Sequence, residues 1–348
     1  MLLLILALAV PFSQMNLILN LASIFLALIP RKLIAVILLL IAAQIFVSTD
    51  QNIVRQLSQP LGKEYTTDMR AFLKTYQLMK EGQNFYPAFA TSMAGLRDGN
   101  FHPDINAWRQ PFIFYLWKIL PGDGVGIYIL WQLFLVAIII SAYLIAKNIL
   151  SPLILWPFLR YSLVDLTILQ PEWWGMAFLV FGLCFFTYKK YYLSGLFFLL
   201  SLMCRELFII PIFFLTLIRF RKYLPFYILF AAYYFFYHLP NIFAFPTEIF
   251  RNYANGNWKT LHSIFAYSSW NYLIGVYRPT LLIFVATMVF AIIKRKNLYY
   301  LLTFLPFFIF TGIMAMTGKI DATRDYWSIY FVPLLLISAP ALILPPEK

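Results

Sequence analysis

The sequence has few charged residues and almost no cysteine. Only 12% of its 348 residues are charged, whereas 62% are hydrophobic. A soluble fold of this length does not need so much apolar surface, but a bilayer demands runs of about 20 apolar residues. The two cysteines, Cys184 and Cys204, fall within apolar runs, which excludes a disulfide framework and the spacing of a zinc site. The composition therefore predicts an all-α, polytopic membrane protein.

The chain also lacks a continuous basic stripe, although its formal net charge is +13. Its basic residues form short clusters in turns between apolar runs, which argues against nucleic acid as a partner. No basic segment precedes the apolar N-terminus, so we expect no cleaved signal peptide. By the positive-inside rule, the basic turns are cytoplasmic. These turns contain Arg31–Lys32, Lys147, Lys189–Lys190, Arg219 with Arg221 and Lys222, and Lys294–Lys296.

We expect one transmembrane domain over residues 1–348, a bundle of roughly ten to twelve transmembrane segments. Residues 1–29 form either one kinked span or two short ones. Because Lys189–Lys190 and Arg219 should share a side, residues 192–218 are expected to cross twice, as two short helices that meet at Cys204-Arg205-Glu206. The other predicted spans are 33–47, 127–146, 149–168, 173–188, 223–243, 279–293, 298–317 and 327–344.

With this topology, most polar residues outside the basic turns lie on the outer face of the membrane, in a loop over 48–126 and an aromatic loop over 244–278. The first loop contains an amphipathic helix that begins near Asp68 and should lie in the interface with its apolar side toward the bilayer. That side is formed by Met69, Phe72, Leu73, Tyr76 and Met79. A second interfacial helix over 111–120 places Phe112, Ile113, Leu116 and Ile119 on one face.

Asp68 stands at the first turn of the amphipathic helix, at the expected level of the lipid headgroups. A carboxylate there is either a helix N-cap or a catalyst. Neither Glu nor Gln occupies position 71, so the chain has no capping box that would strengthen the first interpretation.

The order of the outer motifs resembles a known family. Asp68 opens the first loop helix, which ends at Glu81-Gly82-Gln83-Asn84-Phe85-Tyr86, and Arg109-Gln110-Pro111 follows. A Gln170-Pro171-Glu172 corner and the charged tip Arg205-Glu206 come later. Over roughly residues 33–330 this layout resembles the C-type (GT-C) integral membrane glycosyltransferases, especially the polyprenyl-phosphate-sugar-dependent mannosyltransferases. Trp173-Trp174-Gly175 lacks the Asp of the WWDYG-type motif, and the sugar and acceptor stay open.

The resemblance implies an inverting hexosyltransferase of the plasma membrane whose active site faces outward. It moves a sugar from a polyprenyl-phosphate donor to a glycolipid or glycan acceptor, with Asp68 as general base. Basic residues would hold the donor phosphate, and arginine is favoured for its forked geometry. The candidates for the phosphate are Arg205, Arg324, Lys319 and Arg109. The candidates for binding the sugar or the acceptor are Glu172, Glu206, His262, Trp258, Trp270 and Asn271.

Other interpretations stay open. Arg205 could simply pair with Glu206, Lys319 and Arg324 could belong to a solvated loop, and the aromatic residues could form an interfacial belt. We expect no cofactor, but Glu172 and Glu206 could hold Mg²⁺ or Mn²⁺ if they converge with Asp68. Two alternative functions are a flippase or transporter for a lipid-linked precursor and a non-catalytic subunit of a glycan-assembly complex.

Overall fold

The computed structural model describes residues 51–59, 61, 67–96, 105, 107–163, 166–247 and 329–343. The expected spans at 1–29, 33–47, 279–293 and 298–317 lie outside these residues, as does most of the loop 244–278. Within the described residues the regular secondary structure is entirely helical. The predicted all-α class is therefore confirmed for this part of the chain.

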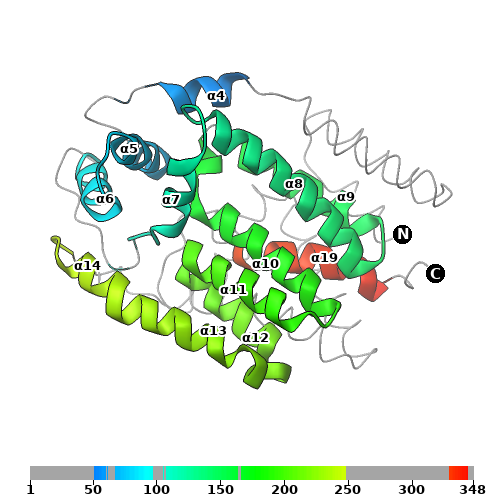
Figure 1. Cartoon of the computed structure of the whole chain (residues 1–348). Helices are drawn as coiled ribbons and strands as arrows, with labels where there is room; N and C mark the ends of the chain where they lie inside the picture. The colour runs from blue at the N-terminus through cyan, green and yellow to red at the C-terminus, as the bar shows by residue number, and fades with distance from the viewer. Residues whose placement is uncertain are drawn as a thin grey trace, which may run out of the picture.

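The described α-helices carry the labels of Figure 1. They are α4 (Gln51–Ser58), α5 (Asp68–Lys80), α6 (Phe85–Ala94), α7 (Phe112–Ile119), α8 (Val125–Ala146), α9 (Leu150–Arg160), α10 (Pro171–Thr187), α11 (Tyr191–Cys204), α12 (Ile209–Thr216), α13 (Phe220–Tyr233), α14 (Leu239–Phe243) and α19 (Val332–Ile343). Short 3-10 turns are η1 (Tyr161–Leu163), η2 (Thr167–Leu169), η3 (Glu206–Phe208) and η4 (Leu217–Arg219), and η5 (Tyr234–His238) is a π-helix.

The long apolar helices form a bundle in which α10 packs between α8 and α11, and α13 packs against α11 (Figure 1). Their sequences explain this, since α8 and α11 contain no charged residue and α10 contains only Glu172. A helix that is apolar on all sides has to be covered on all sides, by protein or by lipid. Helix α10 is covered by protein, because all its residues from Pro171 to Cys184 are buried. A Cβ at its Gly182 would collide with the ring of Phe198 in α11, so the glycine permits this close packing.

Among the described helices, only α8, with 22 residues, is both long and apolar enough to cross a membrane. Helices α10 and α11 are apolar but shorter, with 17 and 14 residues. The predicted segments 127–146 and 173–188 are helical as expected. The predicted break at Arg205 is also confirmed, because α11 ends at Cys204 and α12 begins at Ile209. A polytopic membrane arrangement stays a prediction.

Two predicted segments differ from a simple helix. In place of one helix over 149–168, α9 ends at Arg160 and the 3-10 turns η1 and η2 follow. The segment 223–243 is helical throughout but widens into the π-helix η5. Pro240 follows η5, and in a regular α-helix its ring would clash with the carbonyl of Phe236, four residues earlier.

The amphipathic helix α5 begins at Asp68, as predicted, but its apolar face is covered by protein. The ring of Phe72 lies 6.2 Å from that of Phe89 in α6 and 6.0 Å from that of Phe114 in α7, measured between centroids. The expectation that this face turns toward the bilayer is therefore wrong. The chain supplies its own apolar partners, and packing against them buries the same surface.

The predicted apolar face of α7 is not uniformly buried. Of its four residues, Ile113 is buried, Phe112 and Leu116 are partly buried and Ile119 is 76% exposed, and Phe114 and Trp117, outside that face, are also buried. In an eight-residue helix rich in apolar residues on every side, periodicity alone does not fix the inward face.

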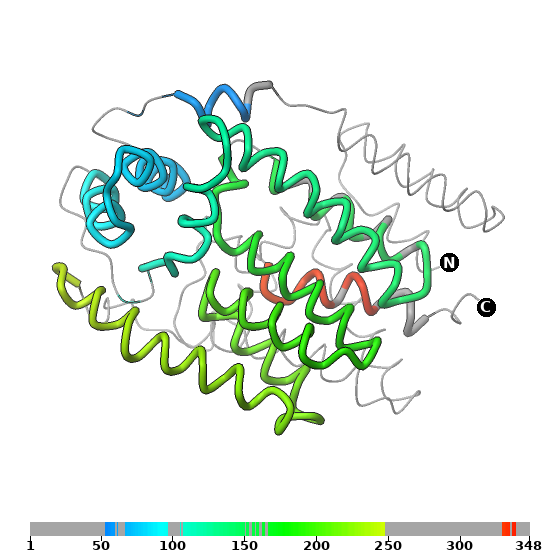
Figure 2. Tube along the Cα trace, viewed as in Figure 1, coloured from blue at the N-terminus to red at the C-terminus, as the bar shows by residue number. Residues whose placement is uncertain are grey.

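Helices α5, α6 and α7 lie at one end of the bundle, at the left of Figures 1 and 2. The start of α10 and the break between α11 and α12 lie at this same end. The turns from α8 to α9, α10 to α11 and α12 to α13 lie at the opposite end (Figure 2). These three turns contain three of the five basic clusters of the sequence, namely Lys147, Lys189–Lys190 and Arg219 with Arg221 and Lys222, so within the described residues the acidic corner at Glu172 and these basic turns lie at opposite ends of the bundle.

Gly124, the N-cap residue of α8, contacts residues of both α4 and α5, and substituting it tests how these three helices pack. Its φ is 89°, its N–H donates to the Tyr76 hydroxyl at 3.2 Å, and a Cβ would collide with the side chain of Leu57 in α4. We expect Gly124→Ala to lower the free energy of unfolding by about 2–4 kcal/mol, from backbone strain and from the collision. Gly82 is the matched control, because its φ is 105° but nothing lies within 4 Å of an added Cβ. Gly82→Ala should cost only the strain, and equal thermal shifts for the two purified variants would contradict the packing of α4.

Candidate functional site

Four charged side chains meet at the end of the bundle beneath α5 and α7. We call Arg109, Glu172, Arg205 and Glu206 the arginine–glutamate cluster. Glu172 Oε1 lies 3.3 Å from Arg109 Nε and 3.2 Å from Arg205 Nε. Arg205 Nη1 lies 2.6 Å from Glu206 Oε1. The formal charges of the cluster sum to zero.

Three separate chain segments position these side chains. Glu172 lies in the first turn of α10, where the helix dipole favours a negative charge. Arg205 is in an extended conformation, with φ −159° and ψ 121°, between α11 and η3. Arg109 comes just before Pro111, the N-cap of α7. The cluster therefore connects the segment before α7 with the break between α11 and α12 and with the first turn of α10.

The cluster is almost completely buried. The exposed fractions of the whole residues are 0% for Glu172, 2% for Arg205 and 4% for Arg109. The side chain of Glu206 is 18% exposed and forms the edge of the cluster. Buried charges persist only where they are paired and hydrogen-bonded. The described structure meets this condition for the two arginines.

Neighbouring polar groups extend the cluster. Arg205 Nη1 donates to the Trp108 carbonyl at 3.1 Å, and Arg109 Nη1 donates to the Ala107 carbonyl at 2.9 Å. Gln110 Nε2 donates to Glu206 Oε2 at 3.3 Å. Within the described residues, Glu172 Oε2 and Gln110 Oε1 are buried and accept no hydrogen bond. Two buried acceptors of the cluster therefore have no donor among the described residues.

Asp68 lies beside this cluster at the start of α5. Thr67 occupies the N-cap position and Asp68 is the first helical residue, so the N-cap interpretation of Asp68 is wrong. The side chain of Asp68 is partly exposed and forms no hydrogen bond or ion pair with the part of the chain that the structure describes.

The first turns of α5 connect Asp68 to the cluster. Gln170 Nε2, at the N-cap of α10, lies 3.5 Å from Met69 Sδ. The guanidinium carbon of Arg109 lies 5.2 Å from the centroid of the Phe72 ring, within the range of a cation–π contact. Two neighbours of Asp68 in α5, Met69 and Phe72, therefore contact Gln170 and Arg109, so the start of α5 packs against the segments that carry the cluster.

A second polar contact links α6 to the bundle, and the sequence did not predict it. The Tyr86 hydroxyl in α6 and Nδ1 of His238 in η5 share a hydrogen bond of 2.9 Å. Burial raises the pKa of Tyr86, so its phenol stays protonated at neutral pH. The one available signal was a histidine within a long apolar and aromatic run. A π-helix often marks a functional position, and here it turns His238 toward α6.

The structure brings together four of the predicted site residues and places a fifth, Asp68, beside them. The pairing of Arg205 with Glu206 is confirmed, and Gln110 is an additional member that sequence reasoning did not assign. The other predicted site residues lie outside the described part of the chain. These are Arg324, Lys319, His262, Trp258, Trp270 and Asn271.

The described residues contain no group of three His, Cys, Asp or Glu side chains placed to hold a metal ion. Glu172 and Glu206 both face Arg205. Among the described residues, the arrangement offers a partly exposed carboxylate without an ion pair at the start of α5, and two buried arginines paired with two glutamates near the same end of the bundle.

No family model, no curated protein and no solved structure matches the chain.

Proposed function

We propose that this protein is an integral membrane glycosyltransferase of the C-type, which moves a sugar from a polyprenyl-phosphate donor to a glycolipid or glycan acceptor. The observation that carries the proposal is the partly exposed carboxylate of Asp68, which has no hydrogen bond or ion pair among the described residues and begins the helix whose Phe72 contacts Arg109 of the arginine–glutamate cluster. A carboxylate that is free of partners can take a proton, and positive charge nearby can stabilise the charge that develops on a leaving phosphate.

In the proposed reaction, Asp68 removes the proton of an acceptor hydroxyl as that oxygen attacks the anomeric carbon of the donor. The bond between the anomeric carbon and the phosphate oxygen breaks, and polyprenyl phosphate leaves with the bonding electrons. Attack from the side opposite the phosphate inverts the anomeric centre. A general base of this kind contributes about 10²–10⁴-fold to the rate.

The arginines take the second role. Arg109 and Arg205 already face Glu172, so a donor phosphate would share their guanidinium groups with that carboxylate. A fixed guanidinium needs little reorganisation when charge develops, which favours catalysis over simple ground-state binding. In this proposal Lys319 and Arg324 add positive charge to the phosphate site, and Glu172, Glu206 and Gln110 receive hydroxyl groups of the sugar or acceptor.

Exposed apolar side chains support the membrane part of the proposal. On α8, which is long enough to span a bilayer, Ile129, Leu133 and Ile140 are 50%, 47% and 47% exposed. On α13, Ile228 and Leu229 are 60% and 57% exposed. Soluble monomers rarely expose such extended apolar surface, whereas lipid tails would cover it. We propose a plasma-membrane location with Asp68 on the outer side and the basic turns on the cytoplasmic side.

The reaction can be tested by following release of polyprenyl phosphate in membranes that contain the overproduced protein. Polyprenyl-phosphate-linked mannose, glucose, arabinose and galactosamine are supplied as donors, and membranes without the protein are the control. We expect one donor to be consumed with transfer of its sugar to a membrane-bound acceptor. Turnover of none of the four donors above the control would count against the proposal.

A further inference from the structure

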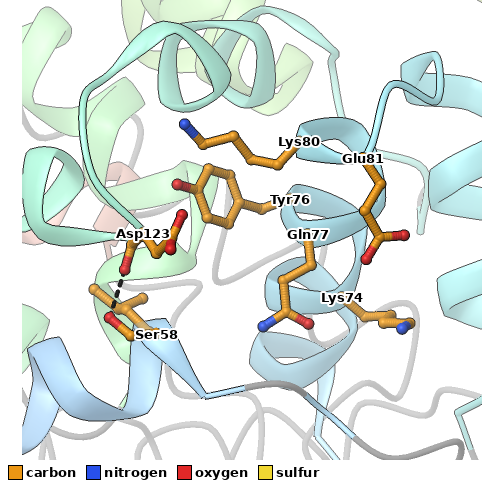
Figure 3. A pocket seen from close by; sticks show the side chains of 8 residues that line it. Ser58, Lys74, Tyr76, Gln77, Lys80, Glu81 and Asp123 are labelled. Carbon is orange, nitrogen blue, oxygen red and sulfur yellow. Dashed lines mark hydrogen bonds between the residues drawn. The ribbon is translucent and has the colours of Figure 1, made fainter.

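A pocket of about 330 Å³ lies between α4, α5 and the turn that precedes α8 (Figure 3). It is lined by Leu57, Ser58, Lys74, Tyr76, Gln77, Lys80, Glu81 and Asp123. Along α5, Lys74 is six residues from Asp68 and Lys80 is twelve, so the pocket begins about 9 Å of helix from Asp68 and extends to about 18 Å; neither Asp68 nor a residue of the arginine–glutamate cluster lines it. The pocket is therefore distinct from the candidate site described above.

The uncharged polar groups of the pocket are already bonded within the protein. The Tyr76 hydroxyl donates to the Gly122 carbonyl at 3.3 Å and accepts from the Gly124 N–H at 3.2 Å. Gln77 Nε2 donates to the Gln59 carbonyl at 2.8 Å, and Ser58 Oγ donates to the Asp123 carbonyl at 2.6 Å. The Tyr76 ring is also buried, since the residue is only 2% exposed. A sugar would find neither an exposed aromatic face nor a free amide here.

The charged groups remain available. Lys80 Nζ is held by one hydrogen bond, of 3.2 Å, to the Leu120 carbonyl. Within the described residues, neither lysine of the pocket forms an ion pair with Glu81 or Asp123. Figure 3 shows Lys80 and Asp123 on one side of the Tyr76 ring and Lys74 and Glu81 on the other. Two cations and two anions give no net charge, so the pocket does not favour a simple anion.

The position of the pocket selects a lipid over a soluble ligand. Asp123 lies two residues before the start of α8, the helix that is long enough to span a bilayer. From that start, Val125, Ile129 and Leu133 follow one face of α8 and are 40%, 50% and 47% exposed. Residues four apart on a helix lie above one another, so this face is a continuous apolar track. A lipid with its head group in the pocket can lay an acyl chain along this track.

We propose that the pocket binds the head group of a zwitterionic phospholipid, with Lys80 contacting the phosphate and Asp123 contacting the ammonium group. Lys74 and Glu81 form the outer rim. Such a head group has a phosphate for a lysine and an ammonium group for a carboxylate, and both contacts are charge-assisted hydrogen bonds. An anionic phospholipid lacks the ammonium group, so Asp123 would have no partner and would face negative charge. The proposal concerns a lipid site and holds whether or not the protein transfers sugar.

The test uses the full chain, purified in neutral detergent and freed of lipid, with bound lipid counted by native mass spectrometry. The probes are phosphatidylethanolamine, phosphatidylglycerol with the same acyl chains, and soluble phosphoethanolamine. We expect the wild type to bind phosphatidylethanolamine about tenfold more tightly than phosphatidylglycerol. Asp123→Asn should abolish this preference, whereas Lys80→Gln should weaken the binding of both lipids. Arg70→Gln removes an exposed charge of α5 outside the pocket and should change neither.

Three results would overturn the proposal. One is equal binding of the two lipids by the wild type, and another is an unchanged preference in Asp123→Asn. The third is binding of phosphoethanolamine as tight as that of the lipid, because the apolar track would then contribute nothing. Thermal unfolding of each variant shows that it is folded, and Asn at position 123 keeps the backbone carbonyl that accepts from Ser58.

Discussion

Asp68→Asn should abolish sugar transfer in membranes while the protein stays folded. Asparagine has the shape of aspartate but no basic oxygen, so it cannot take the proton of the acceptor hydroxyl. We expect the initial rate of polyprenyl phosphate release to fall by about 100-fold or more. The fold should be unaffected, because Asp68 forms no hydrogen bond or ion pair with the described residues. Loss of a negative charge from the first turn of α5 costs only about 0.3–1 kcal/mol.

The matched control for this variant is Arg70→Gln. Arg70 lies in the same first turn of α5, is exposed and lines neither the pocket nor the arginine–glutamate cluster, so its substitution removes one charge from the same helix turn without touching the candidate site. Its transfer rate should equal that of the wild type. Separating kcat from KM in Asp68→Asn gives a second criterion, since a base acts in the transition state and its loss should lower kcat with little change in KM. An unchanged kcat in Asp68→Asn would rule out Asp68 as the base.

Much of the described fold follows from local features of the sequence. Charged residues that interrupt apolar runs marked the ends of α10 and the break at Arg205, because a charge inside an apolar run has to reach a partner or a surface. The polar and apolar rows of residues 68–80 marked α5 in the same way. What the sequence did not indicate was the partner of each apolar face. The apolar side of α5 packs on α6 and α7, and this choice depends on contacts between segments that are distant in sequence.

The candidate site shows the same division. Local reasoning identified Arg205 beside Glu206, and their pairing is confirmed. The contact of Glu172 with both Arg109 and Arg205 joins three segments, and no local pattern predicts such a convergence. The hydrogen bond between Tyr86 and His238 depends on the wider turn of η5, which arises from the position of Pro240 and from packing against α6.

Glu172→Gln should have the largest effect on stability. The substitution keeps the size of the side chain but leaves Arg109 and Arg205, both almost fully buried, with one carboxylate fewer. Breaking a buried ion pair from one side costs about 3–5 kcal/mol, because the remaining charge stays desolvated. We expect a loss of this size in the free energy of unfolding, measured by denaturant or detergent titration of the purified protein. Glu206→Gln should cost less, because the Glu206 side chain is partly exposed and water can replace its carboxylate.

A double variant shows whether the stability cost of Glu172→Gln comes from unbalanced charge or from altered packing. If the cost of Glu172→Gln arises from unpaired positive charge, removing one of the two arginines as well should recover part of the stability. Arg109→Gln in the Glu172→Gln background is therefore expected to be less destabilised than the sum of the two single variants. Additive losses would instead indicate that each side chain acts through packing alone.

The same double variant bears on catalysis, because it restores charge balance while removing a guanidinium group from the proposed phosphate site. Recovered stability without recovered sugar transfer would then assign the Arg109–Glu172 pair a role in the reaction beyond holding the fold together.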